Sequence, residues 1–142
     1  MNFQTLKAEL QSPEYENLTD ADAAALLNAE TIQVKQIILT HDIQQYLVLT
    51  DLLLDIEDGT SDACRNATRA LAVFESFDVT QAMIDAKFTS IINGLVADNS
   101  LPSFVQAHAD NILNMGDKLI SKGVELGLGV IKQANVQYAR GL

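Results

Sequence analysis

Apolar side chains recur at helical spacing in the first part of the chain, and turn-forming residues separate one periodic segment from the next. The pattern predicts a first helix over residues 2–11. A second helix is predicted to begin at Thr19, whose hydroxyl can accept a backbone N–H of the first turn. A longer helix is predicted from Thr40, as its cap, to about Glu57, where Asp58-Gly59 closes it.

The same spacing continues through the second half of the chain. It predicts a helix from Ser61 to Phe77, and then a capping box in which Asp78 and Gln81 open the next helix. One or two further helices are expected between Leu101-Pro102 and Leu126, with a break at Gly116. The clearest apolar stripe belongs to the helix after the capping box: Ile84, Phe88, Ile91, Ile92 and Leu95.

Two stretches alternate instead of following the helical period, which favours short extended segments. They are residues 32–37 and the C-terminal residues 129–138. A short isolated strand would leave its backbone groups unpaired, so the two stretches are expected to pair with each other. The sequence therefore predicts a mainly α fold: a single helical domain over residues 1–142, with about five to seven helices and a small β element.

Composition excludes several classes of partner. A chain of 142 residues with 48% hydrophobic content can bury a proper core. Its net charge of −10 argues against binding nucleic acid or anionic membranes, because the nine basic residues are scattered. No run of residues is long and apolar enough for a membrane span. The single cysteine, Cys64, excludes an intrachain disulfide and fits a reducing cytoplasm.

The GLGVIK stretch near the C-terminus resembles part of a phosphate-binding glycine loop. A dinucleotide fingerprint requires three glycines after a strand and before a helix. Here Lys132 replaces the third glycine, and a helix precedes the loop, so its end presents carbonyls that repel phosphate. We therefore interpret Gly127 as the left-handed residue after a helix, with Leu128 folding back on the last turn.

Candidate metal and catalytic groups do not form a motif. The acidic stretch from Asp55 to Asp62 lacks the glycine and glutamate spacing of a calcium loop, which leaves at most a weak cation site. His41 and His108 have no partner at metal-ligand spacing. A nucleophilic Cys–His pair remains open, because such partners meet only in space, but Cys64 is better explained as a core residue. We predict no enzyme, no cofactor and no metal.

One segment is apolar almost all round, which indicates a central core helix or a contact with another chain. It runs from Tyr46 to Leu54. The C-terminal residues 136–140 are a second candidate contact, because a terminus stays ordered only when it is held. The predicted interface residues are Tyr46, Leu49, Leu52, Val136, Tyr138 and Arg140.

The two ends of the chain resemble small structural proteins of tailed bacteriophages. At the N-terminus the resemblance lies in Thr5–Leu10 and Leu18–Asn28. At the C-terminus it lies in Val124–Val130 and Asn135–Arg140, which carry more of the weight. It covers about a third of the chain, and the middle matches only in being helical.

The resemblance implies a non-enzymatic virion or assembly protein, with helical head–tail connectors as the nearest functional analogy. Its partners would be further copies of the chain and other phage structural proteins, without nucleic acid or membrane. It would be found in the host cytoplasm during assembly and afterwards in the virion. The acidic composition supports a different hypothesis, a small regulator or inhibitor that binds a basic host protein by presenting carboxylates.

Overall fold

The structure is a computed structural model that describes residues 1–142, and the chain divides into two compact units. Unit 1 comprises Met1–Val34 and Leu119–Leu142, and unit 2 comprises Lys35–Lys118. Nine α-helices, two 3-10 helices and four short strands confirm the predicted mainly α fold, with more helices than the five to seven expected. The single domain stays a prediction, because two compact units can still unfold together.

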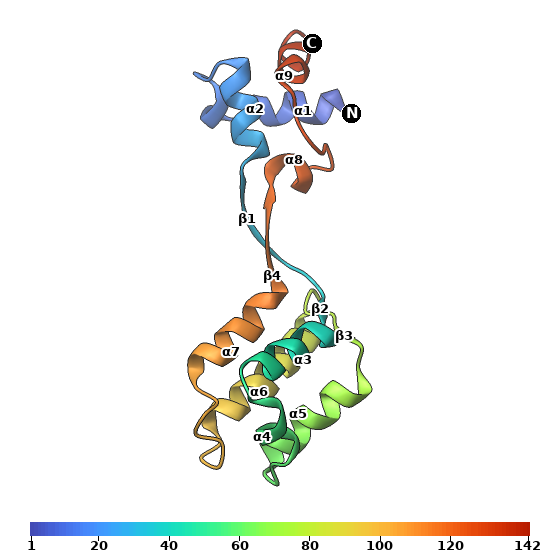
Figure 1. Ribbon diagram of the computed structural model, residues 1–142. Helices are drawn as coiled ribbons and strands as arrows, with labels where there is room; N and C mark the ends of the chain where they lie inside the picture. Colours follow the sequence, from blue (N-terminus) through green and yellow to red (C-terminus); the bar gives the residue numbers. More distant parts are fainter. The chain divides into compact units, whose positions relative to one another are not determined.

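Unit 1 is built from helices contributed by both ends of the chain (Figure 1). The C-terminal helix packs against the two N-terminal helices. Leu6, Leu27 and Val136 are fully buried in the core that these helices share. The elements are α1 (Phe3–Leu10), η1 (Pro13–Tyr15), α2 (Asp20–Asn28), α8 (Lys122–Glu125) and α9 (Gln133–Arg140).

Side-chain caps explain where the N-terminal helices begin. The Asn2 side chain accepts the Thr5 N–H at 3.1 Å and starts α1. The Thr19 hydroxyl accepts the Asp22 N–H at 3.1 Å, which confirms its predicted role as the cap of α2. Asn28 ends α2, and its amide accepts from the Ile131 N–H at 2.8 Å and donates to the Ile131 carbonyl at 2.6 Å.

The glycine-rich stretch ends a helix, as the sequence predicts. Gly127 has φ of 73° and follows α8, which ends at Glu125 with Leu126 as its cap. The Gly127 N–H donates to the Val124 carbonyl at 3.0 Å, and the Leu128 N–H donates to the Gly123 carbonyl at 2.8 Å. These two bonds define a Schellman motif, and Leu128 is buried beneath it.

The predicted C-terminal strand is wrong, because residues 133–140 form α9. Val136 and Ala139 lie three positions apart and are both buried, which is the spacing of a helix face. The Asn135 side chain accepts the Lys132 N–H at 2.8 Å at the start of this helix. A short run of alternating residues is compatible with both periods, and here tertiary packing selects the helix.

The predicted strand near residue 34 does form, as β1 (Glu30–Lys35), but with another partner. It pairs with β4 (Asp117–Ser121) in a two-stranded sheet. The sequence predicted residues 117–121 as helix, so this assignment is also wrong. The break expected at Gly116 is confirmed, because η2 ends there and the chain becomes extended at Asp117.

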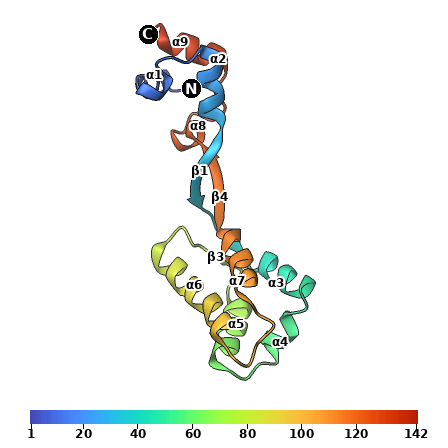
Figure 2. The ribbon, with the colours of Figure 1, turned by 90° about the vertical axis from the view of Figure 1, so that its left-hand side faces the viewer.

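Unit 2 packs its helices around a second, larger core. In the view of Figure 2, α6 lies on the left of this unit, whereas α3 and α4 lie on the right. The elements are β2 (Ile38–Leu39), α3 (Thr40–Leu49), α4 (Leu53–Glu57), α5 (Asp62–Val73), β3 (Ser76–Phe77), α6 (Ala82–Ala97), α7 (Gln106–Leu113) and η2 (Asn114–Gly116).

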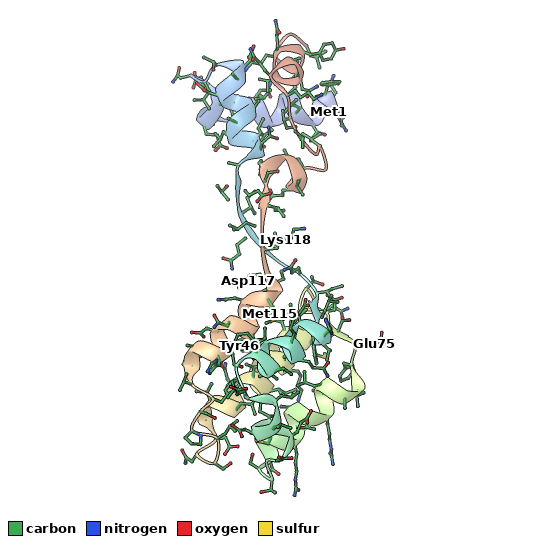
Figure 3. All side chains as sticks on the ribbon, in the orientation of Figure 1. Met1, Tyr46, Glu75, Met115, Asp117 and Lys118 are labelled. Carbon is green, nitrogen blue, oxygen red and sulfur yellow. The ribbon has the colours of Figure 1, made fainter.

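The two ends of unit 2 are held together by Gln36. Its backbone N–H donates to the Gly116 carbonyl at 2.8 Å, and its side-chain amide donates to the carbonyls of Met115 at 3.0 Å and Asp117 at 3.3 Å. Figure 3 labels Met115 and Asp117 at the end of the unit where this contact forms. The Lys35 ammonium adds an ion pair with Asp117 at 3.1 Å.

The long helix predicted over residues 40–57 is broken. Its two parts are α3 and α4, and Asp51 between them has φ of 59°, a left-handed conformation that no helix continues. The break turns Leu52 into the core, where it is buried. The closure at Asp58-Gly59 is confirmed, because Asp58 caps α4.

Two predicted helix caps are also wrong. Thr40 is the first residue of α3, and its hydroxyl donates to the Phe74 carbonyl at 2.6 Å, beside the β2–β3 pair. The Asp78 carboxylate accepts from Thr80 and from the Gln81 side chain in a turn, and α6 begins only at Ala82. In both cases the side chain predicted to cap the helix makes another hydrogen bond: Thr40 makes a tertiary contact, and Asp78 bonds within a turn.

Candidate functional site

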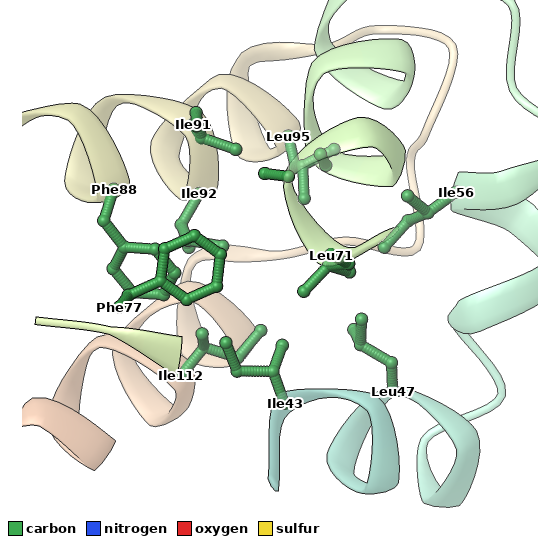
Figure 4. Close-up of a pocket in the computed structure, with 12 residues that line it drawn as sticks. Ile43, Leu47, Ile56, Leu71, Phe77, Phe88, Ile91, Ile92, Leu95 and Ile112 are labelled. Carbon is green, nitrogen blue, oxygen red and sulfur yellow. The ribbon is translucent and has the colours of Figure 1, made fainter. Parts of the chain in front are cut away.

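The core of unit 2 encloses a small hollow that is not a ligand site. Figure 4 shows it, with Ile43 and Leu47 of α3 facing Phe88, Ile92 and Leu95 of α6. Its volume is only about 10 Å³, and no polar surface lines it. This volume is near the lower limit for one water molecule, and a water also needs polar partners. The hollow is therefore a packing defect of an apolar core.

A larger, open groove lies between α5 and α6, and we call it the α5–α6 groove. It consists of two adjoining hollows of about 380 and 440 Å³, which share Ala70, Phe74, Lys87 and Ile91. Met83 and Ile84 line one end. Asn66, Arg69, Val73 and Ser90 line the other.

Large apolar side chains stand exposed at this groove. Val73, Phe74 and Met83 are 71%, 54% and 80% exposed, respectively. The helix predicted from Ser61 to Phe77 would include Phe74, but α5 ends at Val73 and Phe74 already lies in the extended chain that follows. Exposed aromatic and methionine side chains gathered around a concavity are typical of protein-binding surfaces.

Two cations border the groove and have no ionic partner. Arg69 and Lys87 are exposed, and neither forms one of the three ion pairs of the structure. At the Met83 end lies Asp78, whose carboxylate is engaged by Thr80 and Gln81; these hydrogen bonds lower the pKa of Asp78. Asp78 therefore stays ionised, so the lining of the groove carries two cations and one carboxylate and has a net positive charge, in a chain whose net charge is −10.

The predicted interface residues near the α3–α4 break are placed differently from one another. Leu49 is 76% exposed, as an interface residue would be, but Leu52 is buried in the core. Tyr46 is partly buried, and its hydroxyl contacts the His108 Nδ1 at 2.7 Å and accepts from the Asn111 amide at 3.0 Å. Tyr46 thus joins α3 to α7, and Leu49 is the member of this group available to a partner.

The predicted C-terminal interface residues act mainly within unit 1. Val136 is fully buried, and the Arg140 guanidinium binds the Asp20 carboxylate at 2.7 Å and two backbone carbonyls, of Leu18 at 3.0 Å and Tyr15 at 2.9 Å. Tyr138 is exposed, although its ring meets that of Phe3 with centroids 4.6 Å apart. These contacts explain why the C-terminal helix is held without a partner chain.

Cys64 lies beside hydrogen-bonding groups but not beside a histidine. Its thiol is buried and donates to the Asp98 carboxylate at 3.6 Å, while the Ser61 hydroxyl donates to the same oxygen. Hydrogen bonds from Ser61 and Ser100 lower the pKa of Asp98 to about 2. Through these hydrogen bonds the cluster links the start of α5 to the end of α6.

The remaining candidate ligands are not brought together. No group of three or more His, Cys, Asp or Glu residues could hold a metal ion. No helix has both the length and the apolarity needed to span a membrane.

The sequence did not predict the α5–α6 groove. Its residues come from two helices, and in the sequence the apolar ones look like ordinary core-facing positions of each helix. The only sequence signal was the wide apolar face formed by Ala70, Val73 and Phe74.

The chain was also compared with known proteins, by family and by structure. No protein-family model, no curated protein and no solved structure matches it. What the α5–α6 groove can bind therefore follows from its own geometry and charge.

Proposed function

We propose that this protein is a non-enzymatic structural or assembly component of a tailed-phage particle, connector-like or otherwise part of the virion. It acts through self-association and contacts with other phage proteins. The observation that carries the interaction role is the α5–α6 groove, with Val73, Phe74 and Met83 exposed around it. The assignment to phage rests on the resemblance of the two ends of the chain.

The groove supports an interaction role because exposed apolar area is costly in water and gains free energy when a partner covers it. Burial stabilises by roughly 25 cal/mol for each Å² removed from water. Aromatic and methionine side chains are also the types enriched at protein interfaces. Phe74 and Met83 therefore are the residues that we expect to contribute most to binding.

The proposal includes where the protein acts and what it meets. The partners are further copies of the chain and other phage structural proteins, with neither nucleic acid nor membrane among them. The protein would assemble in the host cytoplasm and then remain in the virion, and no cofactor or metal takes part.

The test combines solution mass with incorporation into particles. Size-exclusion chromatography with light scattering should give a mass above that of the 15.5 kDa chain, and the mass should rise with concentration. Protein composition of purified virions from the source phage should include the chain. A strict monomer that is absent from particles would contradict the proposal.

The alternative function is a small acidic regulator that binds a basic host protein. It is favoured by five exposed carboxylates between residues 42 and 58 that form no ion pair: Asp42, Asp51, Asp55, Glu57 and Asp58.

Salt concentration separates the two functions. Binding between opposite charges weakens steeply as salt screens it. Self-association of copies that each carry a net charge of −10 relies on apolar burial, so it should persist at about 0.5 M salt. A complex with a host protein that dissociates over this range would favour the regulator.

A further inference from the structure

Unit 2 carries a second exposed apolar surface, and its charge is opposite to that of the groove. We call it the α3–α4 corner: Val48, Leu49, Asp51, Leu54 and Asp55. Leu49 is 76% exposed and Leu54 is 68% exposed. The left-handed turn at Asp51 buries Leu52, while Leu49 before the turn and Leu54 after it face solvent.

The corner and the groove occupy different faces of the unit. α5 meets α3 and α4 through Thr68, Leu71 and Ala72, whereas it lines the groove with Arg69, Ala70 and Val73. In Figure 2, α6, which forms the other wall of the groove, lies on the side opposite α3 and α4. One copy can therefore present both surfaces at once.

We propose that the α5–α6 groove of one copy receives the α3–α4 corner of a second copy. This inference rests on the proposed function, and it names the surfaces through which self-association occurs. Leu49 and Leu54 would enter the groove against Phe74 and Met83. Asp51 and Asp55 would then approach Arg69 and Lys87, which have no ionic partner within the chain.

Charge selects this pairing over the symmetric ones. Two grooves face to face would bring together two linings of net positive charge, each with Arg69 and Lys87 against the single carboxylate of Asp78, and two corners would bring together the carboxylates of Asp51 and Asp55. A groove with a corner places unlike charges at the border of the apolar contact. Such a head-to-tail interface continues from copy to copy, so it closes into a ring or extends into a filament.

The test uses one variant for each surface. Met83→Asp places a charge in the groove and leaves the corner intact, and Leu49→Lys does the reverse. Both side chains are largely exposed, and both new residues suit the helix end at which they stand, so the fold should be retained. Val130→Asp is the matched control, because Val130 is 77% exposed and lies outside both surfaces.

The expected results are specific to a head-to-tail interface. Each variant alone should be monomeric by light scattering, while Val130→Asp should assemble like the natural chain. An equimolar mixture of Met83→Asp and Leu49→Lys should form a one-to-one dimer that does not grow, because only one of its possible interfaces is intact. A mixture that stays monomeric would overturn the pairing of groove with corner.

Charge reversal provides a second measurement. Lys87→Glu should weaken association about fivefold, and adding Asp55→Lys should recover most of that loss.

If the natural chain assembles and both apolar variants assemble equally well, this inference fails and the proposed function stands. If the natural chain is a monomer absent from particles, the proposed function fails and this inference fails with it.

Discussion

Individual side chains determine where the helices of this protein stop and how their ends are joined. Asp51 adopts φ of 59° between α3 and α4, where most residues other than glycine, asparagine and aspartate are disfavoured. Asp98 collects hydrogen bonds from Ser61, Cys64 and Ser100 at the end of α6. The fold therefore requires a left-handed backbone conformation at Asp51 and an ionised carboxylate at Asp98.

Substitution at Asp51 should show the cost of its backbone conformation. Asp51→Val should lower the free energy of unfolding by about 1–2 kcal/mol, because a β-branched residue is strained at positive φ. Asp51→Asn is the matched control and should be close to neutral, since asparagine tolerates this conformation. Chemical denaturation measures both, and equal stability of the two variants would contradict a left-handed residue at this position.

The Asp98 cluster should make stability depend on pH in the acid range. Its folded pKa of about 2 lies below the ordinary value near 3.9, so its stabilising effect is complete above about pH 4 and is lost as pH falls towards 2. Asp98→Asn should therefore unfold at a lower temperature than the natural chain at pH 5, and this difference should shrink at pH 2. Melting curves at the two pH values test it, and a constant difference would contradict the assignment.

At the scale of elements, two glycines differ in how much space their surroundings leave for a side chain. A Cβ added at Gly123 in α8 would lie 2.5 Å from the Gly129 carbonyl oxygen and 3.4 Å from that of Leu27. In contrast, a Cβ at Gly94 in α6 would meet only the Ala63 Cβ, at 3.9 Å. Glycine is therefore needed at position 123, where the backbone of α8 comes close to the carbonyls of two other segments, whereas α6 has room for a side chain at position 94.

This difference gives a matched pair of alanine substitutions. Gly94→Ala should raise the free energy of unfolding by up to about 1 kcal/mol, because alanine has the higher helix propensity. Gly123→Ala should lower it by about 1–3 kcal/mol through overpacking against rigid backbone. Thermal or denaturant unfolding measures both, and a stabilising effect at Gly123 would contradict the packing of α8.

At the scale of the whole molecule, each of the two units has its own buried cluster. Unit 2 is one continuous segment whose ends are joined by Gln36 and by the Lys35–Asp117 ion pair. Unit 1 is assembled from the two ends of the chain. The groove and the corner, which carry the proposed contacts, both belong to unit 2.

A fragment of residues 35–118 should therefore fold alone. It contains its complete core, and domains of this size can be stable without further chain. Circular dichroism should show a helical fragment with a cooperative thermal transition. An unfolded fragment would instead support the single domain predicted from the sequence.

The sequence itself determined those features that depend on neighbouring residues. Helical period, the Thr19 cap and the glycine turn at Gly127 are local, because each needs only bonds within a few positions. The mainly α class followed from the sum of these signals. Cys64 was also correctly placed in the core from the spacing of its apolar neighbours.

Tertiary structure alone decided what depends on residues distant in sequence. β1 pairs with β4 and not with the C-terminus, because residues 133–140 gain more by burying Val136 and Ala139 as a helix face. Thr40 does not cap its helix, because its hydroxyl donates to the carbonyl of Phe74, 34 positions away. The α5–α6 groove exists only where two helices meet, and the left-handed turn at Asp51 leaves Leu49 exposed while it buries Leu52. Local spacing cannot encode such choices, because burial energies of competing partners decide them.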